Sequence, residues 1–200
     1  MKRKNFFLLL FFILPLIFTS CVDVVQTIDF KNGNYHIGYR ITMTKAFLEM
    51  SGENPENCFS DEDFDDFPED VTLKKINTST DIGYGFDISI SPKTTDETKE
   101  FLPKVLKDGR IEIPLILSDE LSESQNSDYD PETKAISEAM LSSAKWRVFV
   151  TKNLLPSISK AYLENEYGTQ NVDFFEVGDV FVISIPFVLI KEETSLRIEK

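Results

Sequence analysis

The N-terminal segment constrains this chain most, because it decides which residues enter a folded domain at all. A positive stretch, 2–4, precedes a nearly unbroken apolar run, 6–18, and two small residues then lead into Cys21. This order of positive, apolar and small residues is that of a secretory signal. We therefore predict that residues 1–20 are a signal peptide, cleaved between Ser20 and Cys21.

Cys21 makes this segment a lipoprotein signal. The residues before it resemble a lipobox, the site where a bacterial diacylglyceryl transferase modifies a cysteine before cleavage. The usual lipobox has Leu three residues before the cysteine, and Phe18 stands there instead, as in looser lipoboxes such as those of spirochaetes. We predict a lipid anchor on Cys21, in which each buried CH₂ group contributes about 0.8 kcal/mol to membrane binding.

Two other interpretations of the leader stay open. A membrane-spanning helix needs about 20 apolar residues, whereas the run at 6–18 is shorter and contains Pro15. An ordinary signal peptide would leave Cys21 free to pair with Cys58, the second of two cysteines. If Cys21 carries lipid, Cys58 has no partner within the chain, and the fold has no disulfide.

The net charge argues against several partners. The chain carries −13 at pH 7; the leader holds three of the 21 basic and none of the 34 acidic residues, so its removal leaves −16. Binding to nucleic acid or to anionic lipid headgroups needs clustered Lys and Arg, so we expect neither. The remaining length suits a single extracytoplasmic domain over 21–200, with a core rich in Phe.

The start of the mature chain predicts a β-hairpin. The stretch 24–30 is rich in β-formers, and apolar residues alternate along 35–43. An Asn-Gly pair between them can supply the positive φ values of a tight turn. Thr44 can then cap a short helix over 45–50.

The rest of the chain predicts strands mixed with helices. We expect strands at 71–76, 84–90, 110–117, 146–150 and 180–190, and helices at 96–107, 131–143 and 157–167. The acidic stretch 118–130 predicts a mobile loop, and the charged tail 191–200 predicts a frayed end. The expected fold class is α+β, a mostly antiparallel β-sheet with helices packed on one face.

The order of the first segments is similar to that of the LppM-like lipoproteins. An N-terminal cysteine is followed by a hairpin, by 44–50, by an acidic loop and a strand, and by Gly83-Tyr84 before a further strand. The resemblance covers roughly 21–117. It implies an extracytoplasmic α+β domain that handles lipids or glycolipids, and it carries over no catalytic residues and no cofactor.

An acidic cluster is the sharpest local feature. Asp61, Asp63 and Asp65 have the one-three-five spacing of an EF-hand calcium loop. Asp66 stands where that loop needs Gly, and Thr72 stands where it needs a bidentate Glu. We therefore predict a solvated acidic loop and no metal site, with loose Ca²⁺ binding at the three aspartates as the alternative.

No stretch of the sequence forms a catalytic signature. His36 is the only histidine, and as a general base it would need a nearby nucleophile and an orienting acid. We expect it to be an exposed strand residue. No basic residue lies close to Cys58 in the sequence to lower the pKa of its thiol. Tyr84 and Trp146 could line a groove, but aromatic residues on strands are more often core.

Three functions follow as hypotheses. The first is a non-enzymatic module, anchored to a bacterial membrane on its periplasmic or exterior side, that binds a lipid, glycolipid or envelope component. The second is a structural or assembly lipoprotein that acts through protein contacts, and the third is a carboxylate-dependent hydrolase. An apolar cavity favours the first, a flat exposed apolar patch the second, and facing carboxylates with one raised pKa the third. We predict the first.

Overall fold

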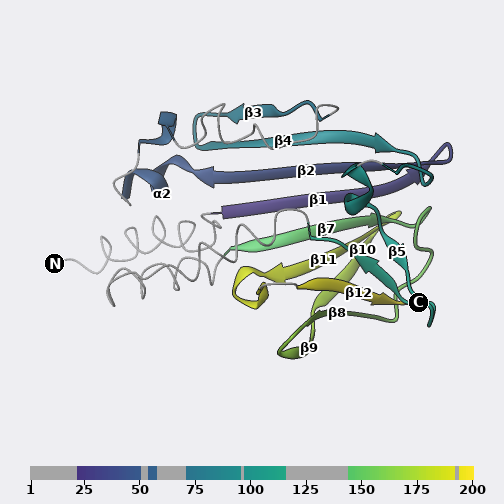
Figure 1. Cartoon of the computed structure of the whole chain (residues 1–200). Coiled ribbons are helices and arrows are strands. Elements are labelled where there is room, and N and C mark those ends of the chain that lie inside the picture. Colours follow the sequence, from purple (N-terminus) through teal and green to yellow (C-terminus); the bar gives the residue numbers. More distant parts are fainter. Residues whose placement is uncertain (1–21, 51–53, 58–70, 96, 116–143, 192–193) are drawn as a thin grey trace.

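The computed structural model describes residues 22–50, 54–57, 71–95, 97–115, 144–191 and 194–200, which form two β-sheets (Figure 1). Among them, no helix is long and apolar enough to cross a membrane. Several predicted features lie outside the described residues: the leader with Ser20 and Cys21, Cys58, the aspartates 61, 63 and 65, the loop 118–130 and the helix 131–143.

The larger sheet has seven strands in the order β10-β11-β7-β1-β2-β4-β3. The strands are β1 (Val22–Lys31), β2 (Asn34–Thr44), β3 (Lys74–Asn77), β4 (Asp81–Ile90), β7 (Lys145–Thr151), β10 (Asp173–Val177) and β11 (Val180–Pro186). Neighbouring strands are antiparallel, except that β1 and β7 are parallel. The chain leaves this sheet after β4 and returns to its middle as β7, beside β1 (Figure 1).

The smaller sheet has five strands in the order β5-β6-β12-β8-β9. The strands are β5 (Lys104–Val105), β6 (Ile111–Ile113), β8 (Lys160–Asn165), β9 (Gly168–Asn171) and β12 (Ser195–Glu199). The helical elements are α2 (Lys45–Met50) and the 3₁₀ turns η1 (Pro55–Asn57), η3 (Glu97–Phe101) and η4 (Phe187–Leu189).

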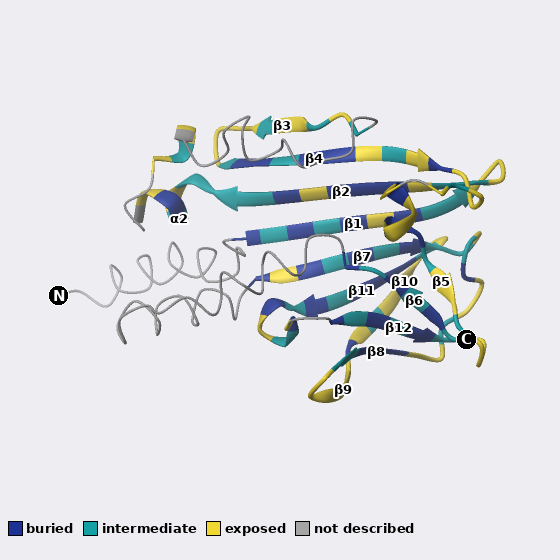
Figure 2. Ribbon diagram, in the orientation of Figure 1, coloured by how far each residue is buried: buried dark blue, intermediate teal, exposed yellow. Residues whose placement is uncertain are grey.

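Alternation along the strands assigns one face of each sheet to a common core. On β1, Val24 and Ile28 are fully buried, while Thr27 on the opposite face is exposed. Figure 2 shows this change between buried and less buried residues along β1. The inner faces of both sheets form one hydrophobic cluster, whose largest fully buried side chains are Trp146, Phe86 and Phe187. Gln26 on the same face of β1 donates a hydrogen bond from Nε2 to the Pro114 carbonyl oxygen at 2.8 Å, which links the larger sheet to the segment after β6.

Local patterns predicted three elements correctly. The hairpin is formed by β1 and β2, and Asn32 and Gly33 at its turn have φ of 55° and 82°. The short helix is α2. The alternation of Trp146 with two valines is β7, and these three side chains are fully buried.

The predicted α+β class is wrong. Among the described residues α2 is the one α-helix, and its six residues cannot form a layer over a sheet. The fold is mostly β. The predicted helix 157–167 is instead β8, because Ala161 and Leu163 point into the core from one face of the smaller sheet. Packing against that core outweighs the helix propensity of Ala, Leu and Glu.

Two further predictions fail for related reasons. The predicted helix 96–107 contains the 3₁₀ turn η3 and then β5, since Pro103 cannot continue a helix. The tail predicted to fray contains β12, which lies between β6 and β8 with Leu196 and Ile198 fully buried. The charged residues of this tail point outward and alternate with buried apolar residues, so the high charge of the segment was misleading. The predicted strand 180–190 ends at Pro186, where η4 begins.

Candidate functional site

The outer face of the larger sheet, the face turned away from the core, brings together polar residues from three neighbouring strands. β2 lies between β1 and β4, so each outward residue of β2 has a cross-strand partner on both sides. Two adjacent rows result: Asp29, His36 and Ser89, then Thr27, Gly38 and Asp87.

These six residues, with Ile37 and Ile88, line a depression of about 330 Å³, here named the Gly38 depression. Gly38 lies at its centre, between Thr27 and Asp87. A Cβ atom on Gly38 would lie 2.5 Å from Thr27 Oγ1 and 2.8 Å from Asp87 Oδ1. The two side-chain oxygens therefore close over the α-carbon of Gly38, which is buried, and the absence of a side chain there lets Thr27 and Asp87 approach each other across β2.

Asp29 is a fixed negative charge at the edge of this depression. Its Oδ1 accepts a hydrogen bond from Thr151 Oγ1 at 2.5 Å and one from Asn153 Nδ2 at 3.5 Å. The Thr151 bond is the main reason that the pKa of Asp29 is lowered, and the bond from Asn153 lowers it further. Asp29 is therefore ionised at neutral pH.

Asp87 is the second carboxylate. Its Oδ2 lies 3.1 Å from Lys74 Nζ, in an ion pair whose side chains are 76% and 65% exposed. Such an exposed pair contributes about 0–1 kcal/mol, so a ligand can displace it. Two carboxylates beside one opening repel phosphate and other anions, and they accept hydrogen bonds from hydroxyl or amino groups.

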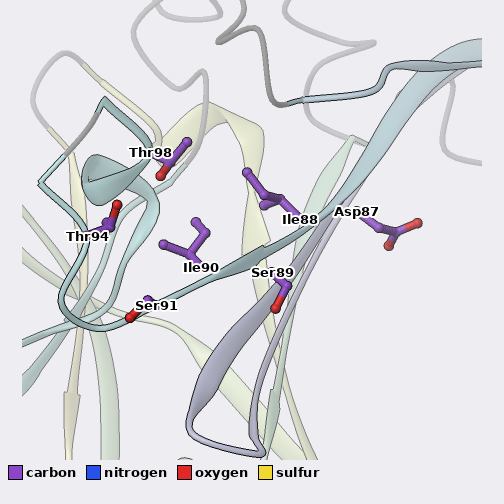
Figure 3. A pocket seen from close by; sticks show the side chains of 7 residues that line it. All are labelled: Asp87, Ile88, Ser89, Ile90, Ser91, Thr94 and Thr98. Carbon is purple, nitrogen blue, oxygen red and sulfur yellow. The ribbon is translucent and has the colours of Figure 1, made fainter.

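A second hollow of about 380 Å³ adjoins the Gly38 depression at the end of β4. Its further lining is Ile90, Ser91, Thr94 and Thr98. Ile88 and Ile90 point toward the segment that carries Thr94 and Thr98, whereas Asp87 and Ser89 point to the other side of the strand (Figure 3). The two hollows therefore flank the end of β4 and together offer several hydroxyl groups.

The row Asp29, His36 and Ser89 holds the residue types of a nucleophilic triad. A working triad needs a base hydrogen-bonded to both partners, and donors for an oxyanion. Among the described residues no hydrogen bond joins His36 to Asp29 or Ser89, and Asp29 is bonded to Thr151 instead. The strand ladder engages the backbone of both His36 and Ser89. The row thus holds these three residue types without the hydrogen bonds that join them in a triad.

The outer face of the smaller sheet is a contrasting polar surface, because its charges pair with one another. The Arg197 guanidinium contacts Glu112 on one side and Glu164, at 2.7 Å, on the other. Where the described carboxyls have a shifted pKa, at Asp29 and at Asp108 beside Arg110, the shift is downward.

The structure also shows where the other candidate residues, His36, Trp146 and Tyr84, lie. His36 is an exposed strand residue, as predicted. Trp146 is fully buried against Tyr39 and Phe187 and lines no groove. Tyr84 lies on the inner face of the sheet, with its ring 6.3 Å from that of Tyr39. Within the described ranges, no group of three or more His, Cys, Asp or Glu residues could hold a metal ion.

Sequence reasoning missed most of the Gly38 depression. One signal was available: a two-residue Asn-Gly turn sets the hairpin register, and that register places Asp29 opposite His36. Ser89 and Asp87 have no such signal, since their positions depend on the pairing of β2 with β4 across a long connection.

No protein-family model matches the chain, and no curated protein and no solved structure matches it either. The resemblance to the LppM-like lipoproteins, the lipid anchor and export from the cell therefore stay predictions. The residues of the outer face carry the case for a function.

Proposed function

We propose that this protein is a lipid-anchored, extracytoplasmic binding module without enzymatic activity, and that it binds a hydroxylated group of an envelope component. The sugar ring of a glycolipid or of an envelope polysaccharide is the ligand class that fits best. One observation carries the proposal: two carboxylates, two hydroxyls and an imidazole line the Gly38 depression together.

The chemistry of a sugar matches this set of groups. Each sugar hydroxyl both donates and accepts hydrogen bonds, ionised carboxylates accept them, and Ser, Thr and neutral His can do either. Phe149 on β7 is the cross-strand neighbour of Thr27 and is partly exposed, so its ring can pack against the apolar C–H face of a sugar beside the depression.

The same structure disfavours a site for an acyl chain among the described residues. The inner faces of the two sheets are filled by buried aromatic and aliphatic side chains. The Gly38 depression and the hollow at the end of β4 are instead open at the surface and lined largely by polar residues. If the ligand is a glycolipid, we expect the protein to hold its sugar while the acyl chains stay in the membrane.

Saturation-transfer NMR tests the sugar site. The full chain, in a zwitterionic detergent that contains no sugar, is mixed with the methyl glycosides of glucose, galactose, mannose and N-acetylglucosamine. We expect transfer to at least one glycoside, and we expect Asp87→Asn and Ser89→Ala to abolish it. Ser184→Ala, an outward serine on β11, is the matched control and should keep the transfer. Absence of transfer to all four glycosides, or transfer that survives both variants, would refute this site.

The anchor has an independent test. Metabolic labelling with a palmitate analogue should tag the wild-type chain and the Cys58→Ala variant, but not Cys21→Ala. An untagged wild-type chain would contradict the anchor and leave the sugar site unaffected.

A further inference from the structure

The half of the outer face formed by β7, β11 and β10 carries a cluster of apolar residues, which distinguishes it from the half that holds the Gly38 depression. This half of the face is here named the apolar half. Its outward apolar residues are Phe149, Phe175, Val177, Val180 and Val182. Phe175 and Val177 on β10 are 53% and 57% exposed. The most exposed part of this patch therefore lies on the last strand of the sheet.

β10 is an edge strand. It pairs with β11, and no other described strand pairs with its far side. An edge strand presents a row of backbone N–H and C=O groups to which another extended chain can bind. The chain can add a strand here because backbone donors, backbone acceptors and apolar side chains all occur together.

The opposite edge of the same sheet is protected in a way that β10 is not. β3 carries Lys74 and Lys75, and lysines on an edge strand are a common device against further pairing. β10 reads Asp-Phe-Phe-Glu-Val, with no lysine, no proline and no glycine. Its composition therefore leaves the edge open to a partner strand.

Charge defines the kind of partner. β10 carries Asp173 and Glu176, and Asp179 lies in the turn that follows. The neighbouring Lys152 already pairs with Glu176, with Nζ and Oε1 2.5 Å apart. A second copy of this chain would place these carboxylates against each other, whereas a basic segment would meet opposite charge.

We propose that β10 binds an extended segment of another protein, in which apolar and basic residues alternate, as an eighth strand of the larger sheet. The apolar side chains of this segment lie on the outer face beside Phe175 and Val177. Its basic side chains lie on the other face, near Glu176. No residue of β10 lines the Gly38 depression, so a strand bound at this edge does not depend on the proposed sugar site.

Fluorescence anisotropy with a labelled ten-residue peptide of alternating Lys and Val tests this inference on the full chain. We expect the peptide to bind, and a Glu-Val peptide of equal length not to bind. Phe175→Ser and Val177→Ser should each weaken binding by about tenfold or more, because each removes an apolar side chain that the bound segment would bury. Added salt should weaken binding of the Lys-Val peptide to the wild-type chain.

Val105→Ser is the matched control. Val105 is 72% exposed on β5, an edge strand of the smaller sheet, and its replacement should leave peptide binding unchanged. Thermal unfolding checks that each variant is folded. The inference is overturned if the Lys-Val peptide fails to bind, if the Glu-Val peptide binds equally well, or if the β10 variants bind normally. It is also overturned if sedimentation shows that the wild-type chain dimerises and that Phe175→Ser abolishes the dimer.

Discussion

The outer face of the larger sheet has two halves, one over β1, β2 and β4 and one over β7, β11 and β10. They share one core but differ in the chemistry of their outward residues. Over β1, β2 and β4 the outward residues, apart from Val25, are polar or glycine, and several of them line a depression. Over β7, β11 and β10 the outward face carries a cluster of apolar residues that reaches an open edge. The inward residues of both halves are mainly large and apolar. The core thus constrains every second residue of each strand, and the other residues are free to build two different binding surfaces.

The outer face of the smaller sheet shows that exposed polar residues alone do not make a binding surface. There Arg197 joins Glu112 and Glu164, and Lys104 pairs with Glu112 at 3.2 Å. Those charges largely satisfy one another. In the Gly38 depression, by contrast, Ser89 and His36 are exposed, and the ion pair of Asp87 is easily displaced.

The largest expected effect is a difference in stability between alanine variants of two glycines, Gly38 on β2 and Gly83 on β4. A Cβ atom on Gly83 would overlap the backbone carbonyl oxygen of Ile41, so Gly83→Ala should lower the free energy of unfolding by about 3 kcal/mol. Gly38→Ala meets the ends of two movable side chains and should cost less than about 1 kcal/mol. Urea denaturation measures both. An equal loss in the two variants would mean that Gly38 is required by the fold and not kept for a ligand.

The next effect separates the buried and exposed parts of the apolar half. Val182 is 5% exposed, so Val182→Ser should lower the free energy of unfolding by about 2 kcal/mol. Phe175→Ser should lower it by only about 1 kcal/mol, because Phe175 is 53% exposed. A large loss in Phe175→Ser would show that this ring stabilises the fold, and it would weaken the case for a partner at β10.

A smaller, pH-dependent effect on stability is expected from the hydrogen bond between Thr151 on β7 and Asp29 on β1. The hydrogen bond from Thr151 lowers the pKa of Asp29 below its ordinary value of 3.8. Its contribution to stability is therefore present above pH 3.8 and is lost as the pH falls through the lower, folded-state pKa. Thr151→Val should be less stable than the wild type at neutral pH, and the difference should shrink under acid. Denaturation at several pH values measures it, and a pH-independent difference would contradict this role.

The smallest effect concerns the exposed ion pair beside the depression. Lys74→Ala should change the free energy of unfolding by less than about 0.5 kcal/mol and should leave Asp87 free to bind a ligand. In the saturation-transfer experiment this variant should keep or increase transfer to the glycoside. A loss of transfer would mean that the ion pair holds Asp87 in position.

Sequence patterns predicted the elements that local chemistry determines. The Asn-Gly turn and the alternation around it predict β1 and β2, and the alternation of Trp146, Val148 and Val150 predicts β7. They did not predict β8 or β12, because helix-forming or charged residues dominate those stretches, and only packing against the second sheet makes them strands. The fold class was wrong for that reason.

The Gly38 depression was even less accessible to sequence reasoning. Its residues come from three strands, and only the hairpin register is encoded locally. The carboxylate bonded by Thr151 depends on a parallel pairing between β1 and β7 that spans more than a hundred residues. The open edge at β10 follows from its position at the end of the sheet, which no local pattern reveals.

Site-specific crosslinking in the cells that produce the protein tests the contrast between the two halves most directly. A photo-crosslinking amino acid is placed at Ser89, at Phe175 or, as a control, at Val105, and the adducts are identified by mass spectrometry. We predict carbohydrate-containing adducts at Ser89, protein adducts at Phe175 and neither at Val105. Adducts of one class at both outer-face positions, or none beyond the control at either, would contradict the assignment of two distinct binding surfaces to this sheet.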